Sequence, residues 1–397
     1  MSTNIASSSA QFSKSAIILA LITTLLFLLF SYFLAQYYPE YSFGFIAIMG
    51  AIFGIALQRS RFCFYCIFTD FFERRDLRGI LGLLVALLVG ALGYHAVFGA
   101  FLPVPDGQQL PPDAHIGAIS WILPISSWVF GFGMAMSGSC ISAQLYRLGE
   151  GLLTAPVALL GVLLGFALGF ISWNPIYLAL MQDAKPLWLP NELGYAGSLL
   201  LQVFIIGGLI FYCLYKINQQ PNATSNIKQQ SIWSVIFQNR WPTWVGGVIV
   251  GIVATVAYFR VGALGVTAEL GSIARTTLAH FWEVSRLEGI DRFTGCMTIV
   301  KESILSNNGV FVISLVIGSF ISALIAGQFK WQVNTIKANA RIFVGGILMG
   351  WGAMLSLGCT VGVFLSGIMA SAVSGWVFAI FCTLGAWVGW YVRRSTT

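Results

Sequence analysis

Ten long apolar stretches are the feature of this sequence that most restricts its fold. A helix needs about 20 residues to cross the hydrocarbon core of a bilayer, where the backbone must satisfy its own hydrogen bonds. Only 9% of the residues are charged, whereas soluble domains average about 25%. We therefore expect an all-α polytopic integral membrane protein with nine or ten transmembrane helices, at 16–37, 42–57, 77–102, 116–136, 153–172, 194–217, 243–259, 309–328, 342–357 and 372–392.

A polar linker divides the chain into two parts of similar length, because 218–230 is its one clearly polar stretch between apolar runs. We predict four parts: an extra N-terminal transmembrane helix (1–41), a first half (42–217), a cytoplasmic linker (218–242) and a second half (243–397). The first apolar run is expected to be a retained helix, since it is longer than the apolar region of a signal peptide and lacks a small-residue cleavage site.

Basic residues predict the orientation, because Lys and Arg are enriched in cytoplasmic loops. They occur in the loop 73–78, the linker, the loop 330–341 and the C-terminus, but not in 102–115. We therefore place the first four in the cytoplasm and 102–115 outside. The exception is 260–308, which would lie outside although it is basic, and part of it is expected to dip back into the protein.

Two segments align without gaps at a constant offset of 219 positions. Gly131, Gly133, Ser137 and Cys140 match Gly350, Gly352, Ser356 and Cys359 in order. The predicted orientation runs the first segment inward and the second outward. This indicates two inverted halves with broken helices at their interface, an arrangement of secondary transporters. Chance similarity between glycine-rich helices is the alternative.

Three cysteines, Cys63, Cys140 and Cys359, lie at predicted helix breaks. A half-helix beginning there would direct its positive N-terminal dipole at an anion. A neutral thiol can donate a weak hydrogen bond to a soft, sulfur-containing ligand. These cysteines therefore predict a path for a sulfur anion, although a buried cysteine can also be a simple packing group.

Cys63 and Cys66 have the spacing of a redox dithiol, so a membrane thiol–disulfide oxidoreductase is a second hypothesis. The βαβ context in which such pairs usually occur is missing. The three histidines show no metal-ligand spacing, and no hydrolase or ATPase motif is present. We therefore expect a transporter without metal or cofactor, and not an enzyme. A sulfur sensor that binds without transport is a third reading.

Charged residues at membrane depth are further candidates for the path. Arg59 and Arg61 flank the first break and could attract an anion or anchor the cytoplasmic surface. Thr267 and Glu269 follow the second-half motif 262–267. A structural ion pair is the simpler expectation for Arg147 and Glu150, which lie three residues apart.

These motifs together resemble the YeeE/YedE sulfur-transport family, which includes thiosulfate permeases of the TsuA type. The resemblance rests on segments 58–63, 138–151, 262–267 and 357–359, which together span about 300 residues. It implies a permease of the bacterial inner membrane, with inverted halves and re-entrant loops around a narrow central path. Thiosulfate would pass along Cys63, Cys140 and Cys359 by S–H hydrogen bonding. A TusA-like sulfur carrier would act beside it in the cytoplasm.

Three features depart from the family pattern: the N-terminal helix, Cys66 and Cys296. Cys66 and Cys296 are therefore further candidates for the path without an assigned role. The substrate stays open among thiosulfate, other sulfur anions and selenium species.

Overall fold

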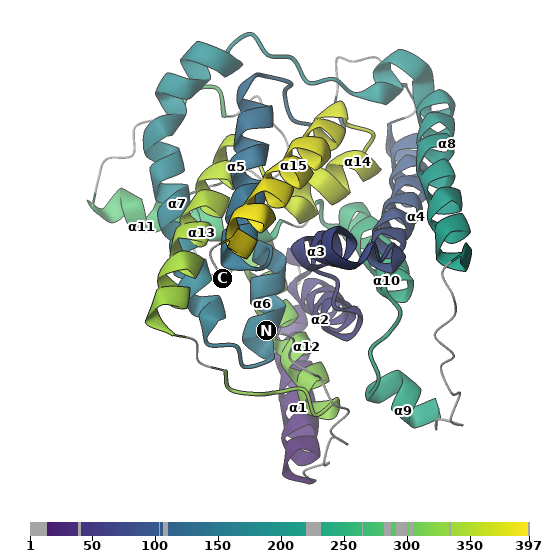
Figure 1. Cartoon of the computed structure of the whole chain (residues 1–397), viewed down its shortest axis with the longest axis vertical. Coiled ribbons are helices and arrows are strands. Elements are labelled where there is room, and N and C mark those ends of the chain that lie inside the picture. The colour runs from purple at the N-terminus through teal and green to yellow at the C-terminus, as the bar shows by residue number, and fades with distance from the viewer. Residues whose placement is uncertain are drawn as a thin grey trace.

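The computed structural model describes residues 14–38, 41–102, 104–105, 110–219, 232–263, 265–281, 287–290, 298, 300–301, 305–332 and 335–395. Their regular structure is helical (Figure 1), with elements α1 (Lys14–Tyr37), α2 (Phe43–Ser60), α3 (Phe64–Arg74), α4 (Arg78–Phe101), α5 (Ile122–Ser137), α6 (Ile141–Gly149), α7 (Thr154–Ile176), η2 (Tyr177–Met181), α8 (Leu189–Gln219), α9 (Ile232–Phe237), α10 (Thr243–Arg260), α11 (Val266–Phe281), α12 (Asn307–Ile325), α13 (Ile336–Leu355), η4 (Thr360–Ser366), α14 (Gly367–Met369) and α15 (Val373–Ser395).

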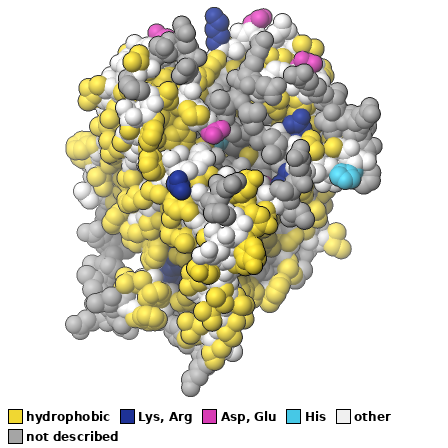
Figure 2. Space-filling view, turned by 180° about the vertical axis from the view of Figure 1, so that it is seen from behind, with side chains coloured by type: hydrophobic (Ala, Val, Ile, Leu, Met, Phe, Trp, Pro, Cys, Tyr) yellow, Lys and Arg dark blue, Asp and Glu magenta, His cyan; other side chains and the backbone are white. Residues whose placement is uncertain are grey.

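Within these described residues, nine helical segments are long and apolar enough to cross a membrane. The prediction of an all-α polytopic membrane protein is therefore confirmed. Hydrophobic side chains cover much of the face in Figure 2, and charged ones are scattered. Such a surface suits lipid, because it would be costly to hold in water. On α8, Phe204 is 82% exposed and Phe211 is 72% exposed.

Two of the expected spans begin elsewhere in the structure. The span expected at 116–136 begins only at Ile122, so α5 has 16 residues and is short for a crossing. Residues preceding it form a loop, in which the Ile119 N–H donates to the Lys185 carbonyl at 3.2 Å. The span expected at 342–357 already begins at Ile336. In α8, the non-helical Gly194 separates a short first part from the long part, which begins where the span at 194–217 was expected. Hydropathy did not show these boundaries because tertiary contacts set them.

The helices of the two parts pair reciprocally. The order from α2 to α7 returns as α10, α11, α12, α13, η4 with α14, and α15. α2 packs on α12 as α4 packs on α10, and α5 packs on α15 as α7 packs on α13. α5 and α13 also pack on each other. Two repeats related by a twofold axis would contact each other in this way, but the repeat and its inversion in the membrane stay predictions.

Small residues allow α5 and α13 to approach closely, as at other helix contacts in membranes. A Cβ at Gly133 would stand 2.8 Å from the carbonyl oxygen of Gly345, and one at Gly352 would stand 2.7 Å from that of Ser126. The two contacts correspond to each other at the offset of 219 found in the sequence, which maps Gly133 onto Gly352 and Ser126 onto Gly345. The aligned glycines therefore occupy corresponding places in the packing.

The segments predicted to be cytoplasmic gather at one end of the bundle, here called the basic end. Arg59 contacts the residues after the linker, with Nη1 3.3 Å from the Gln238 carbonyl. Trp390 Nε1 donates to Glu73 Oε1 at 3.0 Å, which joins the C-terminal helix to the loop 73–78. At the other end, Tyr258 donates to the carbonyl of Pro112, in the loop predicted to be outside. Which end faces the cytoplasm stays a prediction.

Candidate functional site

Short helices begin at the breaks where the sequence placed its cysteines. Cys63 is the N-cap of α3, Cys140 that of α6 and Cys359 that of η4. Glycines precede two of them, with φ of 83° at Gly138 and 153° at Gly358, whereas Arg61 takes the left-handed conformation before Cys63, with φ of 51°. Glycine adopts such angles without steric cost, so the small residues end one helix and let the next begin in a new direction.

Three thiols meet in the first part of the chain. The thiol of Cys63 lies close enough to those of Cys140 and Cys66 to interact with both. The backbone N–H of Cys66 also lies 3.4 Å from Cys63 Sγ. Cys63 and Cys140 have no exposed surface, whereas Cys66 is partly exposed. The structure therefore brings Cys63, Cys66 and Cys140 into one cluster, which we call the thiol cluster.

Cys359 lies beside this cluster in the second part of the chain. It interacts electrostatically with Cys140, and its side chain contacts the hydroxyl of Thr267. Both Cys359 and Thr267 are 1% exposed. The structure thus places Thr267, from the motif at the start of α11, against a candidate cysteine. Cys382 on α15 interacts with Cys140 and Cys359, and sequence reasoning missed it because no helix break marks its position.

Arg147 was predicted to pair with Glu150, and this expectation is wrong. Its Nη2 donates to Cys66 Sγ at 3.1 Å, and its Nη1 donates to the Gly138 carbonyl at 3.3 Å. Glu150 instead accepts from Gln58 at 3.1 Å. Both side chains find partners on other helices, which sequence spacing alone does not reveal. The guanidinium cation of Arg147 therefore lies against the thiol cluster.

The two arginines at the first break differ in their surroundings. Arg59 is 2% exposed, and its guanidinium donates to the carbonyls of Ile236, Gln238 and Asn239 and lies over the Trp241 ring. It holds the segment after α9 against the end of α2. Arg61 is exposed and interacts electrostatically with Cys66. Of these two candidates, only Arg61 lies near the thiol cluster.

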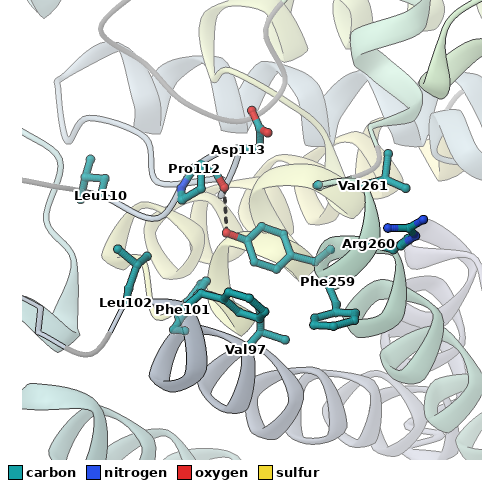
Figure 3. Close-up of a pocket in the computed structure, with 12 residues that line it drawn as sticks. Val97, Phe101, Leu102, Leu110, Pro112, Asp113, Phe259, Arg260 and Val261 are labelled. Atoms are coloured by element: carbon teal, nitrogen blue, oxygen red, sulfur yellow. Dashed lines mark hydrogen bonds between the residues drawn. The ribbon is translucent and has the colours of Figure 1, made fainter. Parts of the chain in front are cut away.

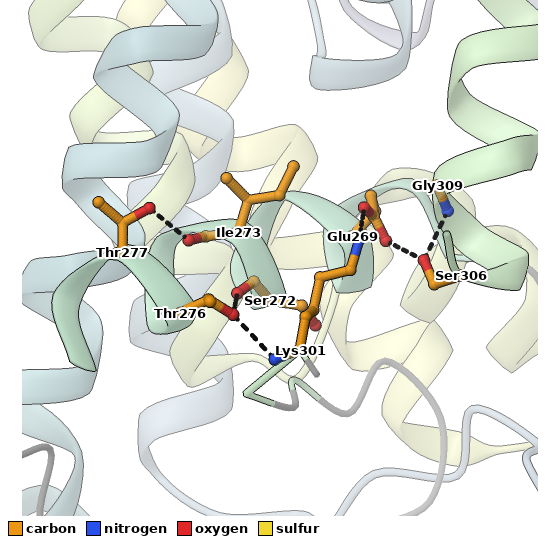
Figure 4. A network of polar contacts seen from close by, with 8 residues as sticks. All are labelled: Glu269, Ser272, Ile273, Thr276, Thr277, Lys301, Ser306 and Gly309. Atoms are coloured by element: carbon orange, nitrogen blue, oxygen red, sulfur yellow. Dashed lines mark hydrogen bonds and ion pairs between the residues drawn. The ribbon is translucent and has the colours of Figure 1, made fainter. Parts of the chain in front are cut away.

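Glu269 belongs to a separate polar network (Figure 4). It forms an ion pair with Lys301 and accepts a hydrogen bond of 2.6 Å from Ser306, the N-cap of α12. The side chain of Glu269 is 7% exposed and that of Lys301 is 11% exposed. This network joins the start of α11 to the start of α12, so it supports the structure that follows the motif 262–267.

Replacing Glu269 with glutamine is expected to lower stability by about 3 kcal/mol, because it breaks the buried ion pair between Glu269 and Lys301. The double variant E269Q/K301M should recover most of this loss. Thermal unfolding in detergent would measure both effects, with the exposed Glu192→Gln on α8 as the matched control. An unchanged unfolding temperature for E269Q would contradict this assignment.

A pocket of about 870 Å³ opens at the end opposite the basic one (Figure 3). Its wall includes Tyr258, Phe259 and Arg260 from the end of α10, and Gly262 from the motif 262–267 that follows this helix. Tyr258 stacks on Tyr94 with ring centroids 4.6 Å apart. Tyr94 lines a smaller cavity with Val361, two residues after Cys359. These rings connect the pocket wall with the surroundings of Cys359.

The arrangement can hold a soft anion but shows no metal centre. Buried thiols stand at the N-termini of short helices, and Arg147 donates to Cys66 in the thiol cluster. In the part of the chain that the structure describes, no group of three His, Cys, Asp or Glu side chains could hold a metal ion. The six described cysteines are free thiols. The candidate Cys296 lies outside the described residues.

Comparison with known proteins adds independent information. A family model described as Sulphur transport matches residues 59–388. The thiosulfate transporter TsuA of Escherichia coli is 27% identical over 367 residues, covering 87% of this chain and 94% of that protein. TsuA of Spirochaeta thermophila is 29% identical over 360 residues, covering 87% and 98%. The probable transporter YedE of Escherichia coli is 31% identical over 83 residues, or 21% of each chain.

Proposed function

Because this chain belongs to the Sulphur transport family, we propose that it is a permease for a small sulfur oxyanion, thiosulfate in the first place. Two relatives that cover 87% of the chain are named thiosulfate transporters. The observation that carries the proposal is the contact of Cys63 with Cys140, at the N-termini of two short helices, with Cys359 nearby.

The proposed path crosses the protein from the pocket of Figure 3 to the basic end. The anion passes Cys359 and Thr267, then Cys140 and Cys63. Each thiol donates an S–H hydrogen bond to the outer sulfur of thiosulfate, and the helix N-termini offset its negative charge. Neutral thiols suit this role, because a thiolate without a cation would repel the anion. Sulfate lacks the soft sulfur and is held less well.

The basic end faces the cytoplasm in this proposal, and the membrane is the bacterial inner membrane. The C-terminus, which follows Arg393 and Arg394, then lies inside, as the positive-inside rule predicts. A TusA-like sulfur carrier would receive the substrate there.

Uptake of radiolabelled thiosulfate into proteoliposomes tests the proposal. We expect uptake well above that of empty liposomes, and weaker competition from sulfate and sulfite than from unlabelled thiosulfate. Selenite as competitor tests the selenium alternative. No uptake above the empty control, or equally strong competition by sulfate, would contradict a thiosulfate permease.

The contact between Cys63 and Cys66 keeps a thiol–disulfide oxidoreductase as the second candidate. Mass spectrometry after alkylation separates the two functions. A redox enzyme cycles this pair through a disulfide between Cys63 and Cys66, whereas a permease forms no such disulfide during transport.

A further inference from the structure

Cys66 differs from the other described cysteines in its surroundings. It alone among those six is partly exposed, and the other five are buried. It lies in the first turn of α3, whose N-cap is Cys63. The N-terminus of a helix carries partial positive charge and favours an ionised thiol. Its position in the helix therefore favours Cys66 as the reactive sulfur of the thiol cluster.

The guanidinium of Arg147 is directed at this sulfur. Its Nη2 donates to Cys66 Sγ at 3.1 Å, while the bond from its Nη1 to the Gly138 carbonyl holds the group in place. The charge of Arg61 acts on the same sulfur. A guanidinium bound to sulfur stabilises the thiolate, which is the nucleophilic form of cysteine. The cation also reduces the repulsion between a thiolate and an approaching anion.

A buried hydroxyl follows Gly138 in the chain, the residue whose carbonyl accepts from Arg147. Ser139 is not exposed, and no described group forms a hydrogen bond with its Oγ. It stands between Gly138, which binds Arg147, and Cys140, which contacts Cys63. A buried hydroxyl without a partner is costly, and an oxygen atom of a ligand would satisfy it. Ser139 and Arg147 can therefore hold the sulfonate group of thiosulfate.

We propose that Cys66 takes the outer sulfur of thiosulfate as a persulfide and releases sulfite at the basic end. This deepens the proposed function and rests on it for the identity of the substrate. The chain would then combine transport with the first step of sulfur transfer. Cys66 is one of the features by which this sequence departs from the family pattern.

The step is balanced without an added oxidant or reductant. The Cys66 thiolate attacks the outer sulfur, so a bond forms between Sγ and that sulfur. The sulfur–sulfur bond of thiosulfate breaks, and its electron pair leaves with sulfite. Thiolate and thiosulfate dianion thus become persulfide anion and sulfite dianion. Arg147 stays beside the reacting sulfur, and a thiolate of a cytoplasmic small molecule or protein then takes the terminal sulfur and restores Cys66.

The test uses the purified full chain in detergent with thiosulfate labelled at either its outer or its inner sulfur. We expect the outer label to remain on the protein until a thiol reductant releases it, and the inner label to appear as free sulfite in equal amount. Peptide mass spectrometry should place one added sulfur atom on Cys66. The variant C66S should retain no outer label, and C213S, in α8, should label like the wild type.

Arg147 variants test the positioning role separately. R147Q should slow persulfide formation about tenfold or more, because a charge-assisted hydrogen bond to the thiolate is lost. R147K keeps the charge and should recover part of the rate. The pH at which labelling is half-maximal should rise in R147Q, a change that a purely structural role would not produce.

Several outcomes would overturn the inference. One is an added sulfur atom on a cysteine other than Cys66, which the peptides of the wild-type protein would reveal without any variant. The others are equal retention of the outer and inner labels, and no retained label at all. Uptake into proteoliposomes without any retained label overturns this inference and leaves the permease intact. A labelled Cys66 without uptake overturns the permease and leaves this chemistry.

Discussion

Replacing Cys140 or Cys359 with alanine is expected to lower thiosulfate uptake about a hundredfold. Each thiol is buried, with 0% and 1% exposure, and lies at the start of a short helix in the proposed path. Removing one leaves the anion without a hydrogen bond in a dry passage. Hydrogen bonds to charged groups contribute about 3 kcal/mol at most, which corresponds to about a hundredfold in rate or binding.

The matched control is Cys213→Ala, which removes a buried thiol from α8 outside the thiol cluster. It should transport at the wild-type rate. Size-exclusion profiles in detergent would show that each variant still folds, since losing one small buried side chain costs little stability. The variant C140S adds a sharper comparison, because it keeps a donor but loses the soft sulfur. Normal uptake by both alanine variants would rule out the cysteine path.

Replacing Gly131 or Gly350 with alanine is expected to destabilise the protein by about 3 kcal/mol or more. A Cβ at Gly131 would collide with the backbone carbonyl of Cys382 on α15, and one at Gly350 with that of Val162 on α7. Backbone cannot move aside as a flexible side chain can, so the helices must separate. The two variants should cost similar amounts, because these glycines hold corresponding places in the reciprocal helix pairs.

Gly208→Ala on α8 is the control for this pair. A Cβ there meets nothing within 4 Å. Its thermal unfolding temperature in detergent should equal or slightly exceed that of the wild type, since alanine favours a helix more than glycine does. If G131A and G208A unfold at the same temperature, the close approach of α5 and α15 does not contribute to stability.

The sequence predicted the class of fold and the places of the candidate cysteines. Membrane helices are readable because every backbone group in lipid must bond within its own helix, which requires long apolar runs. Helix breaks are readable because glycine and serine mark them locally. The structure accordingly has a cysteine as the N-cap of α3, of α6 and of η4.

Side-chain partners were less predictable than helices. Arg147 was expected to pair with Glu150 and instead binds Cys66, while Arg59 binds carbonyls after α9. Each of these bonds joins segments far apart in the chain. Spacing along one helix says which residues share a face, but not what a second helix brings to that face.

The sequence by itself thus determined that the chain spans a membrane, that its two parts share a motif and that cysteines follow the helix breaks. These properties depend on composition and local backbone preference. Only the tertiary structure decided that Cys63, Cys66 and Cys140 meet beside Arg147, and that the hydroxyl of Ser139 is buried without a hydrogen-bond partner. The physical reason is that close packing of helices from distant segments sets these contacts. The residues around one side chain in the sequence do not indicate which distant side chain will contact it.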